Sequence, residues 1–404
     1  MEKKLSAGKL REDNELPLGI NLEKKKERKM KRKFSVSLLV TILIIASLLA
    51  GCTGEEVTPT ASTPTATVAN NRTYSAENPL IIRTSSAFTA ASLPVQDEFI
   101  RFTDEVTQKT GGAIKFQWFV GGAVSKPGEE LDQLKAGFVD LAPSSSTWYG
   151  VLPLWEMNGF LCFQPADVAD AVRIKWQMFH EFPELTNELS AWNITPLLFS
   201  SLTSFQMQSV TPIRTVEDMK GKKVGVLGRG QQMWFNPIGA TAMTVTGPDR
   251  YDALSKKAIE VTCINPNVQQ GEVAPYIVHT DFGCHVTLHF SMNNDTWNKI
   301  VPEDQELIQT IAERYMFEDI PAWYDVQVPL DEQTIVTKFN GEVIDFPQEE
   351  RVKWAQQLPN LAQVWIDEAK TPADHDVRIK LYKRFLELAA ESGHQWPVDP
   401  SQVK

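Results

Sequence analysis

The chemistry that the middle of this chain suggests most directly is the binding of an anion at a glycine-rich turn. Lys223 to Leu227 is a short apolar run with the length of a buried strand, and Gly225, Gly228 and Gly230 allow a ligand to approach the backbone closely. A helix is expected from about Gln231, and the free N–H groups of its first turn favour an anion or a polar acceptor. Ordinary α/β scaffolding explains the same pattern equally well. The glycine spacing differs from the dinucleotide fingerprint, so no cofactor is assigned.

The side chains around this turn are the first candidates for ligand contact. Ligands of open α/β sheets bind just outside the carboxyl ends of strands, and that is where Arg229, Gln231 and Trp234 fall. Aromatic rings can hold an apolar or planar ligand, while amides and hydroxyls can hydrogen-bond it. Packing in the core remains the alternative for each aromatic residue. The further candidates, on loops or strand ends expected to face the same space, are Ser146, Trp148, Tyr149, Phe205, Gln206 and Asn265.

The sequence gives little support for a catalytic site or a metal site. His285 and His289 are four residues apart, which would suit a metal on a helix. Their segment alternates like a strand, however, and there the spacing separates them by about 13 Å. No serine-hydrolase, zinc-protease, phosphate-loop or paired-cysteine motif is present. We therefore predict no catalytic residue and no metal, and an enzyme is not expected.

The amino terminus predicts export. A basic stretch at residues 24–33 precedes an apolar run from Phe34 to Leu49, which is about 16 residues long and short for a membrane span. The following Ala50-Gly51-Cys52 resembles the bacterial lipobox, in which the cysteine carries the lipid. Residues 1–51 are thus interpreted as a signal segment, with 1–29 open as an N-terminal extension. Residues 52–76, rich in Thr, Pro, Ala and Ser, are expected to be a flexible tether.

The net charge and the cysteine content limit which ligands this protein can bind and which disulfides it can form. Residues 1–51 carry 12 Lys and Arg against 6 Asp and Glu, so their removal takes the formal charge from −11 to −17. Such a body is unsuited to nucleic acid, and an anionic ligand would need a local cation. Cys162, Cys263 and Cys284 remain beyond the lipobox, and a Cys263–Cys284 disulfide is left open.

The body of the chain repeats one pattern. Strand, helix, strand, helix and strand follow one another from Leu80 to about Ala142, and the same order returns from Lys223 to Ile264. Segments near 197–210 and 284–292 are expected to cross between the two units. Two α/β lobes with a cleft between them are therefore predicted. Long amphipathic helices are expected from Pro302 onward, interrupted by a strand-like piece at residues 334–339 and 343–344.

Several ordered segments resemble the substrate-binding proteins of TRAP transporters, the DctP-type or family 7 extracellular solute-binding proteins. The resemblance runs from about residue 80 to 370, and its segments include FTDEVTQKTGGAIKFQWFVGGAV, ELDQLKAGFVDLAPSSS, PIRTVEDMKGKKVGV and MNNDTWNKIVPEDQELI. It implies an α/β, two-lobed periplasmic-binding-protein-like fold with a central ligand cleft. It also implies delivery of the captured molecule to integral membrane permease subunits driven by an ion gradient. Within that fold we place lobe I at 77–196 plus 284–310, lobe II at 197–283 and a helical region at 311–404.

One departure from the family pattern bears on the ligand. The family usually has a carboxylate-gripping Arg where this chain has Gly225, so Arg229 is predicted to be a displaced anchor, or else the pocket is aromatic and largely neutral. Cys263-Ile264 stands where metal-assisted members have a Glu-Trp pair, which argues against a metal.

The predicted function is capture of a small organic molecule, an organic acid or a related compound, by a lipid-anchored extracytoplasmic receptor. A secreted enzyme using the same cleft and a binding protein of an ATP-driven transporter are the alternatives.

Overall fold

The computed structural model describes residues 72–89 and 95–401, without the side chains of Trp148 and Tyr149. The predictions for the signal segment, for Cys52 and for most of the tether lie outside the described residues. Where the chain is described, no helix is long and apolar enough to cross a bilayer. The described residues belong to one compact unit.

The first lobe is built on a five-stranded sheet covered by α2 (Gln96–Lys109). β1 runs parallel to β2 and β3, and β10 runs antiparallel to β3 and β4. α2 buries Phe99, Phe102 and Val106, whose spacing of three and four places them on one helix face. Phe99 stacks on Phe290 with 5.0 Å between ring centroids, which ties the helix to the sheet. In spatial order the strands are β2 (Ile114–Phe119), β1 (Leu80–Ser85), β3 (Leu141–Ser145), β10 (Leu288–Asn293) and β4 (Ile194–Ser200).

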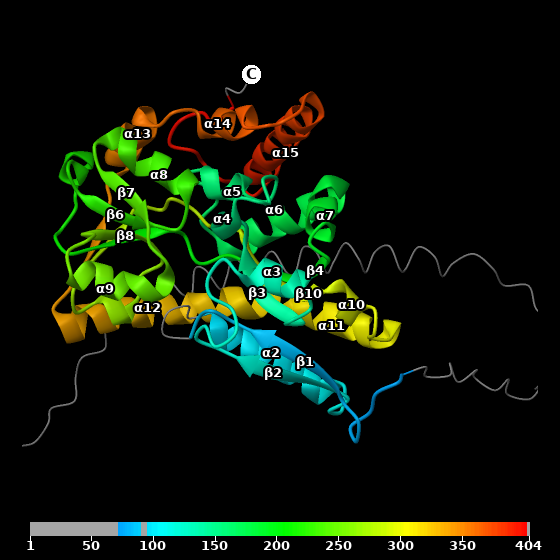
Figure 1. Cartoon of the computed structure of the whole chain (residues 1–404). Coiled ribbons are helices and arrows are strands. Elements are labelled where there is room, and N and C mark those ends of the chain that lie inside the picture. Colours follow the sequence, from blue (N-terminus) through cyan, green and yellow to red (C-terminus); the bar gives the residue numbers. More distant parts are fainter. Residues whose placement is uncertain (1–71, 90–94, 402–404) are drawn as a thin grey trace, which may run out of the picture. The chain divides into compact units, whose positions relative to one another are not determined.

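The second lobe is built on a six-stranded sheet (Figure 1). β6 is parallel to β7 and β8, whereas β5 is antiparallel to β8 and β9. Two short helices, α8 (Arg229–Phe235) and α9 (Arg250–Ser255), follow β6 and β7. In spatial order the strands are β11 (Glu342–Asp345), β9 (Tyr276–His279), β5 (Gln206–Ser209), β8 (Val261–Ile264), β6 (Lys223–Val226) and β7 (Thr241–Thr244).

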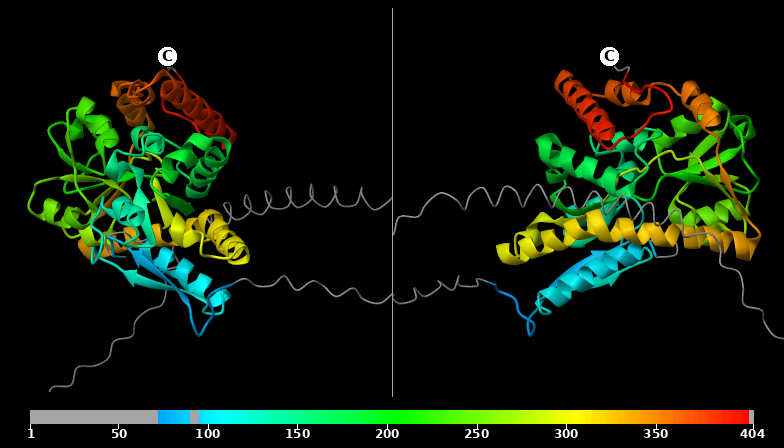
Figure 2. Two further views of the ribbon diagram at one scale, coloured as in Figure 1. Left: turned by 45° about the vertical axis from the view of Figure 1, so that its right-hand side comes forward. Right: turned by 180° about the vertical axis from the view of Figure 1, so that it is seen from behind.

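Two chain crossings and one long helical run join the lobes. The chain passes to the second sheet at residues 201–205 and returns at 280–287. After α10 (Asn294–Trp297), the helices α11 (Pro302–Arg314) and α12 (Ile320–Phe339) are joined without a break by the π-helical turn Tyr315–Asp319. α11 contacts β4 and α12 contacts β11, so the run extends along both lobes (Figure 2).

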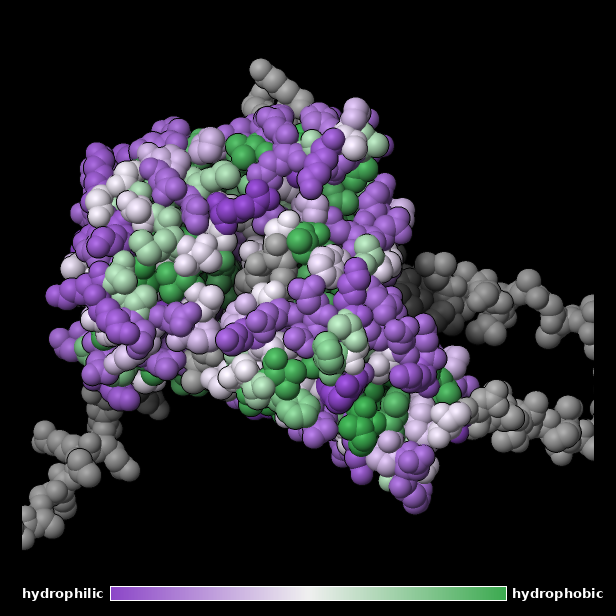
Figure 3. All heavy atoms as spheres, in the orientation of Figure 1, coloured by the Kyte–Doolittle hydropathy of each residue, from purple (hydrophilic) through white to green (hydrophobic). Residues whose placement is uncertain are grey.

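The remaining helices cover the lobes and the side where the chain ends. α15 packs on α6 and α14, and α14 packs on α5 (Figure 1). Apolar residues reach the face drawn in Figure 3 only as separate patches among hydrophilic ones. These helices are α3 (Glu130–Lys135), α4 (Ser146–Tyr149), α5 (Met157–Phe160), α6 (Val168–Glu181), α7 (Pro183–Ser190), α13 (Gln348–Gln357), α14 (Leu361–Asp367) and α15 (Pro372–Glu391), with 3-10 turns at Val216–Met219, Asn236–Ile238, Gly247–Asp249 and Val268–Gln270.

The pattern of elements is largely as expected, with two local differences. Residues 334–339, which contain β-branched residues and suggested a strand, form the last turns of α12, where the Thr334 and Thr337 hydroxyls donate to carbonyls four residues earlier. The strand expected at 138–142 begins at Leu141, because Gly137 adopts φ +69° and Phe138 is exposed. β4 (Ile194–Ser200) pairs within the first sheet, and β11 (Glu342–Asp345) pairs within the second. The residue limits predicted for the two lobes, 77–196 plus 284–310 and 197–283, stay predictions.

A histidine links three elements of the second lobe and predicts a pH dependence. His279 at the end of β9 bonds Glu332 of α12 at 2.7 Å and Asp345 of β11 at 3.2 Å. The hydrogen bond to Glu332 raises the pKa of His279 above its ordinary value. The stabilisation is therefore fully present below the unfolded-state pKa of about 6.5 and is lost as the pH rises through the higher folded-state pKa.

We expect His279→Gln to lower the free energy of unfolding more at pH 6 than at pH 9, as measured by urea denaturation. The control is His180→Gln, which alters an exposed ring bonded to the Trp176 carbonyl. An equal loss at both pH values for His279→Gln would contradict the linkage.

Candidate ligand-binding site

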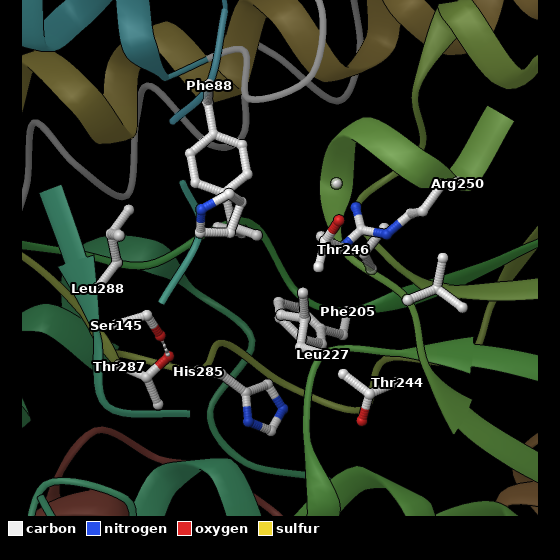
Figure 4. Close-up of a pocket in the computed structure, with 15 residues that line it drawn as sticks. Phe88, Ser145, Phe205, Leu227, Thr244, Thr246, Arg250, His285, Thr287 and Leu288 are labelled. Atoms are coloured by element: carbon white, nitrogen blue, oxygen red, sulfur yellow. Dashed lines mark hydrogen bonds between the residues drawn. The ribbon is translucent and has the colours of Figure 1, made fainter. Parts of the chain in front are cut away.

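A cavity of about 120 Å³ lies between the two sheets. Ser145, Thr244 and Ile264 end the strands β3, β7 and β8, and Leu227 directly follows β6. The cavity is thus at the carboxyl ends of strands from both lobes, which is where open α/β sheets bind ligands. Its lining residues (Figure 4) are Phe88, Pro127, Ser145, Leu202, Phe205, Leu227, Thr244, Val245, Thr246, Gly247, Arg250, Ile264, His285, Thr287 and Leu288.

Arg250 is the only charged side chain among these lining residues. It begins α9, is only 4% exposed, and its guanidinium points toward Thr246 and the space between the lobes (Figure 4). Among the described residues its Nε atom has no hydrogen-bond partner and the guanidinium pairs with no carboxylate. Burial lowers the pKa of Arg250 to about 10, so the group stays charged at neutral pH. A buried, unpaired cation is costly, and an anionic ligand would remove that cost.

Aromatic rings form the side of the cavity nearest the crossing segments. The ring of His285 lies 4.5 Å from that of Phe205 and 4.7 Å from that of Trp234. His285 Nδ1 is 2.6 Å from the Asn158 carbonyl oxygen, to which a neutral ring can donate. Burial lowers the pKa of His285 to about 4, so at neutral pH this ring adds no second positive charge.

Hydroxyl groups line the side formed by β3 and the return crossing. Ser145 donates to the Thr287 hydroxyl at 3.1 Å, and its oxygen is also 2.9 Å from that of Thr147. Figure 4 shows Ser145 and Thr287 across the cavity from Arg250. The site therefore has a cationic end, a neutral hydrogen-bonding end and apolar side chains between them.

The structure brings only some of the predicted site residues to this cavity. Phe205 lines it, while Ser146 and Asn265 are buried neighbours in sequence of the lining residues Ser145 and Ile264. The side chains of Trp148 and Tyr149 lie outside what the structure describes. The other predicted residues are engaged in the protein itself: the Gln206 amide with Asp281, Gln231 with the Leu227 N–H, and Trp234 with the Phe160 carbonyl.

Arg229 lies outside the set of lining residues and is paired with two carboxylates. Its guanidinium is 2.8 Å from Glu156, whose side chain is 4% exposed, and 2.6 Å from Glu368. It also lies over the Phe160 ring at 4.8 Å. The hydrogen bond to Glu156 raises the pKa of Arg229, so the ion pair persists over the whole physiological range. These contacts join α8 to the α5 region and to the end of α14.

The structure also accounts for the glycine at position 225. A Cβ atom built on Gly225 would be 2.7 Å from Ile259 Cδ1 and 3.4 Å from a methyl group of Val245. Val245 itself lines the cavity. The space that a side chain on this strand would need is thus filled by aliphatic groups.

Replacement of Arg229 is expected to affect stability more than ligand binding. We expect Arg229→Ala to lower the free energy of unfolding by about 1 to 3 kcal/mol, because it leaves the buried Glu156 carboxylate unpaired. The cost is not larger because the Arg229 side chain is 45% exposed and water screens the ion pair. Chemical denaturation measures the loss. In the matched control, Arg214→Ala, the lost partner Glu342 is 44% exposed, so the cost should stay below about 1 kcal/mol. Equal losses in the two variants would contradict a structural role for Arg229.

Sequence reasoning missed Arg250, and a signal for it was present. Arg250 is the only Lys or Arg between Gly230 and Ser255, and it lies a few residues after the strand Thr241–Thr244. The same strand-end rule that selected Arg229 applies to it. Its acidic neighbours Asp249 and Asp252 are typical of a solvated helix start, which weakens this signal.

Within the described residues, the cysteines and the other metal-ligating side chains are not gathered into a second site. Cys162, Cys263 and Cys284 are buried free thiols, so the Cys263–Cys284 disulfide that the sequence left open is not formed. In the described part of the chain no three His, Cys, Asp or Glu side chains gather as a metal site would require.

Two lobes with a cavity between them can enclose a small molecule. Comparison with known protein families shows to which class of protein this chain belongs. The family model for bacterial extracellular solute-binding protein, family 7 (DctP), matches residues 85–368. The chain therefore belongs to this family, as its segments predicted, and it is an extracytoplasmic solute-binding protein of the transport type.

A curated protein and several solved structures are similar to this chain. The uncharacterized protein YiiZ of Salmonella typhimurium is 24% identical over 268 residues, which are 63% of this chain and 79% of that protein. A marine metagenome TRAP solute-binding protein specific for aromatic acid ligands has a TM-score of 0.67 at 18% identity, covering 78% of this chain and 98% of its own. The TRAP solute-binding protein of Sulfitobacter with bound β-D-galacturonate has a TM-score of 0.62 at 21% identity, covering 76% and 100%. The predicted fold class is thereby confirmed.

Proposed function

We propose that this protein captures a small organic acid between its two lobes, with the carboxylate held by Arg250. The observation that carries the proposal is the buried guanidinium, which lines the cavity and has no carboxylate partner among the described residues. Charge-assisted hydrogen bonds from Arg to a carboxylate are among the stronger ones in proteins. Structural relatives support the same class, since those from Bordetella bronchiseptica and Rhodoferax ferrireducens hold mandelate and benzoate, respectively.

Arg250 replaces Arg229 in this proposal as the anchor. Arg229 already has two carboxylate partners within the protein, so a ligand would have to displace them. Phe205 stays in the proposed site as part of its apolar wall. Gln231 accepts a hydrogen bond from the N–H of the lining residue Leu227, and Trp234 packs against the lining ring of His285. The cavity draws residues from both lobes, so a ligand that contacts both would favour the closed arrangement.

The captured acid is proposed to pass to the integral membrane subunits of a TRAP-type permease driven by an ion gradient. That step follows from the family and needs no nucleotide-hydrolysing subunit. Cys52 is proposed to carry a lipid that holds the receptor at the outer face of the cell membrane. We expect full-length protein with Cys52→Ser to move from the membrane fraction to the soluble extracytoplasmic fraction. Retention of that variant in the membrane fraction would exclude the lipid anchor.

A thermal-shift screen of small organic acids tests the receptor function. Because a ligand that binds only the folded state stabilises it by mass action, an acid at about 100 times its Kd should add roughly 2.7 kcal/mol and raise the Tm. Isothermal titration of each stabilising compound gives its stoichiometry, expected to be one. If no organic acid raises the Tm of correctly folded protein, the proposed function fails.

A further inference from the structure

The number of charges in the cavity limits the ligand to one carboxylate. Arg250 is the only cation among the described lining residues, and His285 is held neutral by its burial between Phe205 and Trp234. A second carboxylate would therefore enter a buried space with no opposite charge, which is costly. A dicarboxylate is therefore expected to bind more weakly than a monocarboxylate of the same size.

The apolar lining residues favour a ligand whose body, the part beyond the carboxylate, is apolar. Phe88 and Leu288 come from the first lobe, Leu227 and Val245 from the second, and Leu202 from a crossing. Aliphatic and aromatic walls gain from contact with a ring or a branched chain. A sugar acid would set most of its hydroxyls against these apolar side chains, because the hydroxyl partners among the lining residues are only Ser145, Thr244, Thr246 and Thr287.

The size of the cavity limits that body to about one ring. Its volume of about 120 Å³ is close to the roughly 150 Å³ of an apolar cavity that binds benzene. A second ring or a long chain would require the lobes to move apart. The hydroxyls of Ser145 and Thr287, across the cavity from Arg250, can accept or donate one more hydrogen bond at the far end of such a body.

We infer that the ligand is a monocarboxylate with an apolar body the size of one benzene ring, anchored on Arg250 at one end and able to place a hydroxyl group against Ser145 and Thr287 at the other. The inference rests on the proposed function and specifies its substrate class. Arg250 belongs to the second lobe and Ser145 to the first. A ligand that contacts both residues therefore holds the two lobes together.

Titration calorimetry of the whole exported chain with matched compounds tests the class. We expect 3-hydroxybenzoate and benzoate to bind, and benzamide, which has the same ring without the charge, to bind weaker by about tenfold or more. Isophthalate, with its second carboxylate, and galacturonate, with its hydroxyls, should also bind at least about tenfold weaker than benzoate. Tighter binding of isophthalate or galacturonate than of benzoate would overturn the inference and leave the proposed function intact. Binding of none of these and of no other organic acid would instead remove the proposed function.

Ser145→Ala tests the hydroxyl end. The variant should lower the affinity for 3-hydroxybenzoate by about fivefold, the effect of one neutral hydrogen bond, and leave that for benzoate within about twofold. Ser255→Ala, on the exposed side of α9, is the matched control and should change neither. An equal loss for both ligands in Ser145→Ala would assign Ser145 to the structure of the cavity and contradict its role in selecting a hydroxyl group.

Discussion

Arg250→Met is expected to lower the affinity for the organic acid by about 100-fold or more. Such a loss corresponds to roughly 2.7 kcal/mol, within reach of a two-point Arg–carboxylate contact inside a buried cavity. Calorimetric titration of the variant measures it. Methionine has a similar length and fills the space, so the cavity should keep its shape.

The same variant is expected to make the ligand-free protein more stable. Arg250 is 4% exposed and has no carboxylate partner among the described residues, so its charge is buried without compensation. Removing it should raise the free energy of unfolding by about 1 to 3 kcal/mol in the absence of ligand. Stability gained and binding lost in one substitution is the signature of a residue retained for function.

The control for this prediction is Arg173→Met, which alters an Arg on α6 whose side chain is 53% exposed. It should change neither ligand affinity nor the free energy of unfolding by more than about 0.5 kcal/mol. If Arg229→Ala abolishes binding and Arg250→Met does not, the anchor is Arg229, as the sequence alone predicted.

Gly230→Ala is expected to be the most destabilising of the small substitutions in the α8 turn. A Cβ atom at this position would be 2.4 Å from the Gly159 carbonyl oxygen and 2.9 Å from Phe160 Cα. Both contacts are to the backbone of α5, so no side-chain rotation relieves them, and α8 must move away from α5. The movement also disturbs the 2.8 Å hydrogen bond from Trp234 to the Phe160 carbonyl. We expect a loss of about 3 kcal/mol, at the upper end of the cost of overpacking.

Chemical denaturation with a second glycine as control separates crowding from backbone strain. Gly137 adopts φ +69° but has no atom within 4 Å of its Cβ position, so Gly137→Ala should cost only the strain of a left-handed residue, about 1 kcal/mol. A loss in Gly230→Ala no larger than that in Gly137→Ala would contradict the close packing of α8 on α5.

Most elements of the fold could be predicted because they depend on local patterns. The apolar spacing in α2, the short strand before Gly228 and the repeated strand–helix order are properties of neighbouring residues. The same local segments carried the resemblance to the family. The exceptions are informative: residues 334–339 have strand-like composition but lie in α12, where burial of Ile335 and continuation of the helix outweigh local preference.

For the candidate site, the sequence could indicate a location but not its chemistry. The strand-end rule pointed to the ends of β6 and β8, and the cavity that Phe205 lines lies at those strand ends. The rule could not say which of the two arginines is paired with carboxylates of the protein. That depends on partners far away in sequence, since Arg229 pairs with Glu156 and Glu368, which are 73 and 139 residues from it.

The sequence by itself determined the class of this protein: export, two α/β lobes, long C-terminal helices and membership of the solute-binding family. The tertiary structure alone decided the chemistry of the cavity. Ile259 and Val245 fill the space at Gly225, two carboxylates engage Arg229, and Arg250 is buried beside the cavity with no carboxylate partner in the described part of the chain. The physical reason is that secondary structure follows from short-range periodicity, whereas the compensation of a charge depends on side chains that only folding brings together.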